Sequence, residues 1–312
     1  MNNENEFLKP LSSDDEDKLK PLSFETKTQT TKDDFVPIAP TGGYEIKNKD
    51  SNFVFFFGTP QSGKSVILSS MLYWLSSQAG VLHPKLGMPN TKEAQGLLAD
   101  FFENMRKGIL PERSTRDAVT RLDFDFEPNN KSKKIIPVNL TFLETSGENH
   151  NEIRRGGSYH SSIESFLNAN IPLTFIIVTS YESAHKEDNI IYNFLDVLER
   201  KGKNLKFVNA ILVISKWDES GRMVVDNTDE LDNFIYENLP MTAQRIDTYG
   251  LSKTFYTIGN IQKNSNGDEK LTLLSLTTAE VLSKWLYRSI VGYNLDYEGT
   301  FWERIKFSFS NQ

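Results

Sequence analysis

The chain of 312 residues contains no cysteine. This excludes disulfide bonds, thiol catalysis and zinc sites built from cysteine. The sequence also has no run of about 18 consecutive apolar residues, so it predicts no membrane-spanning helix. Its first residues are rich in Asn and Glu and lack the apolar core of a secretory signal, which favours a cytoplasmic protein.

A surplus of basic residues is also missing. The chain has 35 Lys and Arg against 42 Asp and Glu, a formal net charge of −7. Because general nucleic-acid binding needs a basic face, we expect no nucleic-acid partner. The four histidines show no metal-binding spacing: His83, His150, His160 and His185. We interpret them as surface or packing residues, with His150 as the exception because of its position next to the turn 144–148.

Composition divides the chain into three parts. Residues 1–45 read as a disordered acidic tail and linker, with Asp14–Asp17 as an acidic run and few apolar side chains to bury. Residues 46–293 form the domain that can fold. Residues 294–312 form a C-terminal extension. Its segment 301–309 carries four large apolar residues and is either a helix packed on the domain or a docking handle, and packing is the favoured interpretation.

The domain alternates short apolar strands with amphipathic helices, which predicts an α/β fold with a mostly parallel sheet. The predicted strands cover residues 53–57, 173–178, 207–214 and 254–258, and the predicted helices lie within 66–80, 92–107, 190–198, 231–239 and 277–291. Alternating patterns at 122–126 and 136–142, separated by a turn at 128–131, predict one antiparallel hairpin. In such a sheet the ligand lies at the carboxyl ends of the strands.

The most informative segment is Gly58-Thr59-Pro60-Gln61-Ser62-Gly63-Lys64-Ser65, which fits the phosphate-binding pattern G-x-x-x-x-G-K-[ST]. An apolar strand precedes it and an apolar helix follows it. In this motif backbone N–H groups surround phosphates, Lys64 reaches the terminal phosphates, and the Ser65 hydroxyl binds Mg²⁺. The competing interpretation is a chance Gly/Ser turn, which the strand before and the helix after disfavour.

Two further motifs end predicted strands. Glu144 closes the first and begins the turn Glu144-Thr145-Ser146-Gly147-Glu148, where an acid can lie beside Mg²⁺ and a backbone N–H can meet the γ-phosphate. Ser215-Lys216-Trp217-Asp218 closes the second. Each could instead be an ordinary polar strand end.

Together the three motifs resemble those of P-loop GTPases of the translation-factor and Ras-like (TRAFAC) class, over about residues 50–293. Within this class the turn 144–148 is most similar to that of bacterial stand-alone GTPase-like domains of conflict and defence loci. The resemblance implies a three-layer Ras-like fold, GTP or GDP with Mg²⁺ as ligands, and a molecular switch read by unidentified protein partners. A homodimer is left open.

The resemblance also implies the roles of individual residues. Lys216 and Asp218 would read guanine, since the carboxylate pairs with two donors that adenine lacks. The loop 257–260 would touch the base. The nucleotide-binding residues implied are Gly58, Thr59, Pro60, Gln61, Ser62, Gly63, Lys64, Ser65, Val66, Gly147, Ser215, Lys216, Asp218, Ile258 and Gly259.

The metal ligands implied are Ser65, Glu144 and a switch threonine, for which Thr115 is the best candidate and Thr120 the rival. The catalytic residues implied are Lys64, Thr115 and Glu148. Arg113 or Arg116 would act as a cis arginine finger, although an arginine in a polar loop is more often simply solvated.

Three positions depart from the class pattern. Glu144 replaces the usual aspartate, and Ser215 replaces Asn or Thr and should lose some bracing of the phosphate loop. Glu148 stands where the class often carries glutamine, and its negative charge near a phosphate predicts slow intrinsic hydrolysis, helped by a partner or by His150.

Three functions compete. The first is a GTP-dependent switch with slow Mg²⁺-dependent hydrolysis, built on an enlarged first switch before Glu144 and a second switch in residues 148–160. The second is a scaffold subunit that holds GTP without turnover. The third is an ATP-dependent P-loop enzyme, which would need an arginine-rich lid that the sequence does not show.

Overall fold

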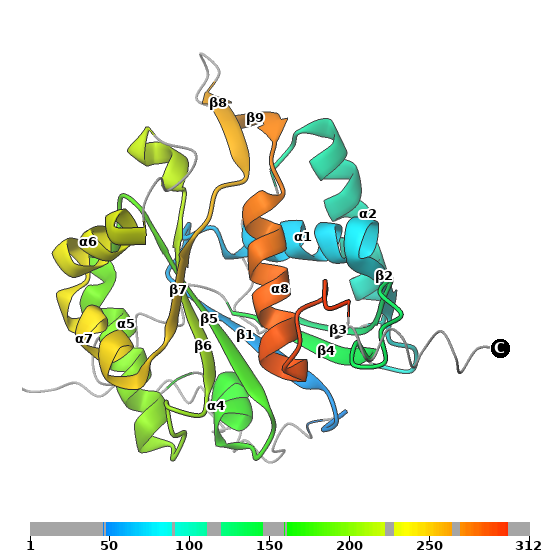
Figure 1. Cartoon of the computed structure of the whole chain (residues 1–312), viewed down its shortest axis with the longest axis horizontal. Helices are drawn as coiled ribbons and strands as arrows, with labels where there is room; N and C mark the ends of the chain where they lie inside the picture. Colours follow the sequence, from blue (N-terminus) through cyan, green and yellow to red (C-terminus); the bar gives the residue numbers. More distant parts are fainter. Residues whose placement is uncertain are drawn as a thin grey trace, which may run out of the picture. The chain divides into compact units, whose positions relative to one another are not determined.

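The computed structural model describes residues 46, 48–88, 91–110, 120–145, 159, 161–221, 228–263 and 269–298. The chain divides into two units, Met1–Gly42 and Gly43–Gln312, and only the second contains described residues. The predicted tail 1–45 lies outside the described residues. The second unit is built on a seven-stranded sheet with helices on both faces (Figure 1).

The strand order in the sheet is β2-β3-β4-β1-β5-β6-β7. The strands are β1 (Asn52–Phe57), β2 (Gly80–Pro84), β3 (Thr120–Pro128), β4 (Val138–Glu144), β5 (Leu173–Ser180), β6 (Asn209–Ser215) and β7 (Ser252–Phe255). All neighbours from β4 to β7 pair in parallel, whereas β3 is antiparallel to both β2 and β4. The predicted α/β fold, mostly parallel with one antiparallel hairpin, is therefore confirmed. The edge strand β2 was not predicted.

The central strand β1 explains why the sheet is covered on both faces. Its residues from Phe53 to Phe57 are all buried. Alternate side chains of a strand point to opposite faces. Accordingly Phe53, Phe55 and Phe57 pack into one hydrophobic cluster, and Val54 and Phe56 pack into the other. A strand without polar positions forms only where both faces are covered.

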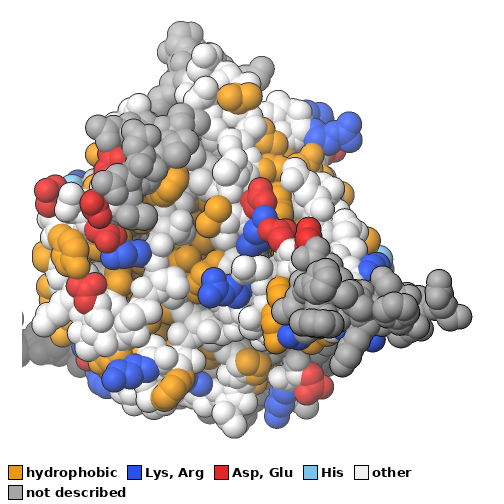
Figure 2. All heavy atoms as spheres, viewed as in Figure 1, with side chains coloured by type: hydrophobic (Ala, Val, Ile, Leu, Met, Phe, Trp, Pro, Cys, Tyr) orange, Lys and Arg blue, Asp and Glu red, His pale blue; other side chains and the backbone are white. Residues whose placement is uncertain are grey.

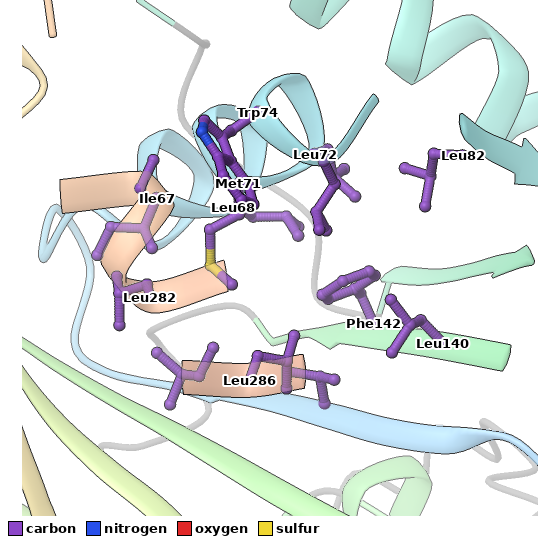
Figure 3. Close-up of a cluster of buried hydrophobic side chains, with 14 of the residues drawn as sticks. Ile67, Leu68, Met71, Leu72, Trp74, Leu82, Leu140, Phe142, Leu282 and Leu286 are labelled. Atoms are coloured by element: carbon purple, nitrogen blue, oxygen red, sulfur yellow. The ribbon is translucent and has the colours of Figure 1, made fainter. Parts of the chain in front are cut away.

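The first cluster joins the sheet to α1 (Lys64–Trp74), α2 (Thr91–Lys107) and α8 (Thr277–Val291). Figure 3 shows Leu68 and Met71 of α1, Leu282 and Leu286 of α8 and Phe142 of β4 in one cluster of buried side chains. A π-helical turn over Leu75–Ala79 continues α1 to the start of β2, as expected for a helix that stops near residue 80. The helix predicted within 92–107 is confirmed as α2.

The second cluster joins the other face to α4 (Ser161–Asn168), α5 (Ala184–Arg200), α6 (Thr228–Asn238) and α7 (Pro240–Tyr249). Helix α7 was not predicted, and it begins at Pro240. Proline is tolerated at a first helical position. The carboxylate of Asp188 accepts hydrogen bonds from the backbone N–H groups of Met241 (2.9 Å) and Thr242 (2.8 Å), which otherwise lack helical partners.

A second, two-stranded sheet follows β7. It consists of β8 (Gly259–Lys263) and β9 (Glu269–Leu274), paired antiparallel. The prediction of a strand over 254–258 was wrong at its end, because β7 stops at Phe255 and the chain turns into this hairpin. The backbone N–H of Leu271 donates to the carbonyl of Gly108 at 3.0 Å, so the hairpin is bonded to the segment that follows α2 (Figure 1).

The beginning of the C-terminal extension packs on the domain. Leu295 is buried, and Asn130 Nδ2 donates a 2.6 Å hydrogen bond to its carbonyl. Residues 299–312 lie outside the described residues. Within the described ranges, no helix has both the length and the apolar character needed to cross a bilayer. On the face drawn in Figure 2, the basic and acidic side chains of the described residues are interspersed.

Candidate functional site

The three motifs found in the sequence meet at one edge of the sheet. Strand β1 ends at Phe57, β4 at Glu144 and β6 at Ser215. Phe56 pairs with Glu144, and Ser180 of the intervening strand β5 pairs with Ser215. Because these strands are parallel, their carboxyl ends lie along the same edge, which is where α/β folds bind ligands.

The loop from Gly58 to Ser65 depends on two glycines. A Cβ atom at Gly58 would lie 2.4 Å from the carbonyl oxygen of Val178, and Gly63 has φ 89°, in the left-handed region. Helix α1 starts directly after Gly63 and has no side-chain cap. Its first N–H groups and its dipole therefore favour an anion.

Lys64 lies inside this loop and is 5% exposed. Its Nζ donates hydrogen bonds to the carbonyl oxygens of Gly58 (2.8 Å) and Thr59 (2.9 Å). Burial lowers the pKa of Lys64 to about 8, and the carboxylates of Glu144 and Glu187 oppose this shift. An ammonium group is thus held within the loop where the sequence predicts the phosphates.

Ser65 and Glu144 are in direct contact. The Ser65 hydroxyl donates a hydrogen bond to Glu144 Oε1, although the two residues are 79 positions apart in the chain. The longer side chain at position 144 therefore still reaches the side of the loop that carries Ser65. A hydroxyl and a carboxylate are hard oxygen donors of the kind that Mg²⁺ binds.

The third motif braces the loop. Ser215 is 1% exposed, and its Oγ donates a 2.6 Å hydrogen bond to the carbonyl oxygen of Ser62. The serine hydroxyl therefore reaches the loop, and a partial loss of bracing relative to Asn or Thr stays a prediction. Lys216 adopts φ 53°, a left-handed conformation that is uncommon outside glycine and recurs at functional sites.

Trp217 anchors the motif while its neighbour Asp218 stays accessible. Trp217 is 1% exposed and packs against Phe234 and Phe255 with ring centroids 5.5 and 5.6 Å apart. Asp218 is half-buried, and its Oδ1 accepts a 3.2 Å hydrogen bond from Thr257 Oγ1. The loop after β7, predicted to touch the base, therefore lies beside the predicted guanine-reading carboxylate.

Ile258 and Gly259, both predicted to bind nucleotide, also have roles in holding the fold together. The side chain of Ile258 is buried, and its carbonyl accepts a 2.8 Å hydrogen bond from the N–H of Ser275. A Cβ atom at Gly259 would lie 1.9 Å from the carbonyl oxygen of Leu273 in β9. The close approach of β9 is therefore a sufficient reason for glycine at position 259, whether or not this loop touches a ligand.

Several predicted site residues lie outside the described residues: Arg113, Thr115, Arg116, Gly147, Glu148 and His150. Thr120, the rival switch threonine, is the first residue of β3 and pairs with Glu144 along the backbone. Its position next to Glu144 in the sheet keeps it as a candidate.

Sequence reasoning missed one carboxylate at this edge. Glu187 is 4% exposed, and its Oε1 accepts a 2.5 Å hydrogen bond from Thr59 Oγ1 in the loop. The available signal was an acid in the first turn of a helix that follows a fully buried strand. That signal is weak, because acids are common in first turns.

No protein-family model matches the sequence, and a search of curated proteins also finds no match. Among solved structures the chain is similar to a dimerisation-deficient mutant of Toc33 from Arabidopsis thaliana, to a probable GTP-binding protein engB, and to the signal recognition particle receptor SRb in an SRb-GTP/SRX complex from Chaetomium thermophilum.

The sequence identities to these three are 12%, 12% and 11%, and the TM-scores are 0.38, 0.37 and 0.40. The matches cover 77%, 77% and 76% of this chain, and 84%, 99% and 98% of the other chains. Values this low transfer no ligand and no activity to this chain.

Proposed function

We propose that this chain is a P-loop GTPase that acts as a molecular switch. It binds GTP with Mg²⁺, hydrolyses it slowly to GDP and phosphate, and presents different switch loops to protein partners in the two states. The observation that carries this proposal is the bonding of one loop to both other motifs. Ser65 of the loop bonds Glu144, and Ser62 of the same loop accepts a hydrogen bond from Ser215.

The donors at the site fit a magnesium–triphosphate ligand. Ser65 and Glu144 supply two hard oxygens, and the described part of the chain has no cluster of three or more His, Asp or Glu side chains that would hold a metal alone. Mg²⁺ commonly takes one or two protein ligands and completes its shell with phosphate and water. Bound there, it would neutralise charge on the phosphate oxygens.

The chain's own residues would divide the remaining work. Lys64 supplies a buried positive charge for the phosphates, and the N-terminus of α1 supplies N–H donors. Asp218, beside Thr257, would accept from the two ring donors of guanine. Thr115, Gly147 and Glu148 belong to this proposal as switch threonine, γ-phosphate contact and water-orienting residue, respectively.

A nucleotide competition experiment tests the base specificity. Unlabelled GTP should displace labelled GTP from the purified chain, and an equal concentration of ATP should not. The Asp218→Asn variant should bind GTP at least about tenfold more weakly and should gain affinity for xanthosine triphosphate. Asp232→Asn is a matched control, because that carboxylate pairs with Lys253 at 2.8 Å and belongs to none of the motifs.

Equal displacement by ATP would contradict the guanine assignment and favour the ATP-dependent enzyme. The scaffold alternative is separated by phosphate release. Wild type should release phosphate from GTP faster than Lys64→Ala. If wild type and Lys64→Ala release phosphate at the same background rate while wild type still binds GTP, the chain is a scaffold subunit that holds GTP without turnover.

Placement among bacterial stand-alone GTPase-like domains of conflict and defence loci rests on the residues of one turn, Glu144-Thr145-Ser146-Gly147-Glu148. A cytoplasmic location and the division into 1–45, 46–293 and 294–312 rest on composition. A mass measurement with GTP and with GDP tests whether a second copy of the chain is among the partners.

A further inference from the structure

A buried carboxylate outside the three motifs touches the phosphate loop. Glu187 lies in the first turn of α5, and its Oε1 accepts hydrogen bonds from Thr59 Oγ1 (2.5 Å) and Ser183 Oγ (2.6 Å). The Ser183 hydroxyl is also bonded to that of Ser180 at 2.6 Å. A chain of side-chain hydrogen bonds thus runs from the end of β5 to the second residue of the loop.

The other oxygen of this carboxylate is left without a partner. Glu187 Oε2 is buried and makes no hydrogen bond to any residue that the structure describes. A half-satisfied buried carboxylate destabilises a fold. The charge of Glu187 interacts with Lys64, since both Glu187 and Glu144 favour the protonated form of that lysine. Packing alone does not account for a glutamate at position 187. Two properties of Glu187 remain as possible reasons, which are its hydrogen bond to the loop and its negative charge.

We propose that Glu187 is a positioning residue of the nucleotide site with two separable effects. Its Oε1 holds Thr59 and so fixes the loop, and its negative charge weakens binding of the phosphate chain. This inference rests on the proposed nucleotide function and adds a residue that the three motifs do not contain.

The first effect follows from how Thr59 is used. The carbonyl oxygen of Thr59 is one of the two acceptors that hold Lys64 Nζ, and the side chain of the same residue is held by Glu187. Fixing this side chain therefore restricts the residue that orients the ammonium group. A loop held in one conformation loses less conformational entropy when a ligand binds.

The second effect follows from charge. Glu187 is 4% exposed and lies against the loop, so water screens its charge little. A phosphate chain placed in the loop carries charge of the same sign, and the repulsion grows with each added phosphate. The carboxylate therefore shapes the loop while it lowers the affinity of the triphosphate more than that of the monophosphate.

Two substitutions separate the effects. Glu187→Gln removes the charge and keeps an oxygen that can accept from Thr59. Thr59→Val keeps the charge and removes the hydrogen bond, while Thr59→Ser restores the hydroxyl. Glu199→Gln on the same helix is the matched control, because Glu199 bonds Arg245 and Tyr249 and touches no residue of the loop.

The experiment measures calorimetric binding of GTP, GDP and GMP with Mg²⁺ to the full chain and these variants. Glu187→Gln should bind GTP about threefold to tenfold more tightly, with a smaller gain for GDP and none for GMP. Thr59→Val should bind GTP about tenfold more weakly, and Thr59→Ser should lie within about twofold of wild type. Glu199→Gln should match wild type.

A second measurement needs no nucleotide. Amide hydrogen exchange in residues 58–65 of the ligand-free protein should be faster in Thr59→Val and unchanged in Glu187→Gln. A purely structural role for Glu187 predicts weaker binding and faster exchange in both variants, and that result would overturn the inference. Unchanged binding in Glu187→Gln would overturn the charge effect. If wild type binds no GTP, the proposed function itself fails.

Discussion

The hydroxyl of Ser215 donates a 2.6 Å hydrogen bond to the carbonyl oxygen of Ser62, and so joins the end of β6 to the loop between β1 and α1. Both residues are almost fully buried. A loss of this bond would leave the Ser62 carbonyl without its partner in a place that water does not reach. The bond therefore holds the segment 215–218 and the loop 58–65 together.

Ser215→Ala should destabilise the fold by about 1–2 kcal/mol, because it removes the donor and leaves a buried acceptor unpaired. It should also weaken GTP binding by about tenfold, since the loop loses a support. Urea unfolding and calorimetric titration measure the two effects. Ser62→Ala is the stability control, because the Ser62 hydroxyl has no hydrogen-bond partner among the described residues and its removal should not destabilise the protein.

Thr257→Val should reduce the preference for GTP over ATP by about threefold to tenfold. The Thr257 hydroxyl donates to Asp218 Oδ1 at 3.2 Å and accepts from the N–H of Gly259 at 3.3 Å, so it orients the carboxylate and the following turn. Parallel titrations with GTP and ATP give the ratio. An unchanged ratio would mean that the carboxylate is oriented without this contact.

The lowered pKa of Lys64 should make the stability of the protein depend on pH when nucleotide and Mg²⁺ are absent. Its pKa is lowered by burial to about 8 in the fold, from 10.5 when unfolded. Between these values the unfolded chain binds more protons, so this residue's contribution to stability is most favourable above the unfolded pKa and is lost as the pH falls through about 8.

The stability difference between wild type and Lys64→Met should therefore shift by about 2 kcal/mol in favour of wild type between about pH 7.5 and about pH 9.5. Urea unfolding at several pH values measures this difference, and the subtraction removes the titration of other groups. A difference that is flat with pH would mean that the ammonium group is not destabilised by burial.

Ser283→Ala should stabilise the fold by about 1 kcal/mol. The Ser283 hydroxyl is buried and has no hydrogen-bond partner in the described part of the chain, and it lies beside a small cavity lined by Leu75, Phe126 and Leu286. Figure 3 shows Leu286 among the apolar side chains of this region. Thermal unfolding of both proteins measures the change. A loss of stability would indicate that the hydroxyl holds a water molecule in the cavity.

The sequence predicted the elements whose patterns are long and unambiguous. The continuous apolar run from Phe53 to Phe57 before the glycine-rich loop predicts a strand, and the helix within 92–107 and the hairpin of β3 and β4 follow from periodicity. The three motifs could be placed at one edge because parallel strands share the direction of their carboxyl ends. This placement needed only the positions of the motifs relative to the predicted strands.

Other features depend on tertiary contacts that no local pattern encodes. Strand β2 is short and forms because residues from Gly80 pair with β3. Helix α7 starts at Pro240, and its first turn is stabilised by Asp188, which bonds N–H groups 53 and 54 positions later in the chain. The contact of Glu187 with Thr59 spans 128 positions, and the inward position of the Lys64 ammonium depends on how the loop closes.

Calorimetric titration of the purified chain with GTP in the presence of Mg²⁺ tests the central claim most directly. The account predicts a saturable heat of binding that weakens when Mg²⁺ is removed and falls at least about a hundredfold in affinity in Lys64→Ala. Absence of heat with every purine triphosphate, with Mg²⁺ present and the protein folded, would contradict it.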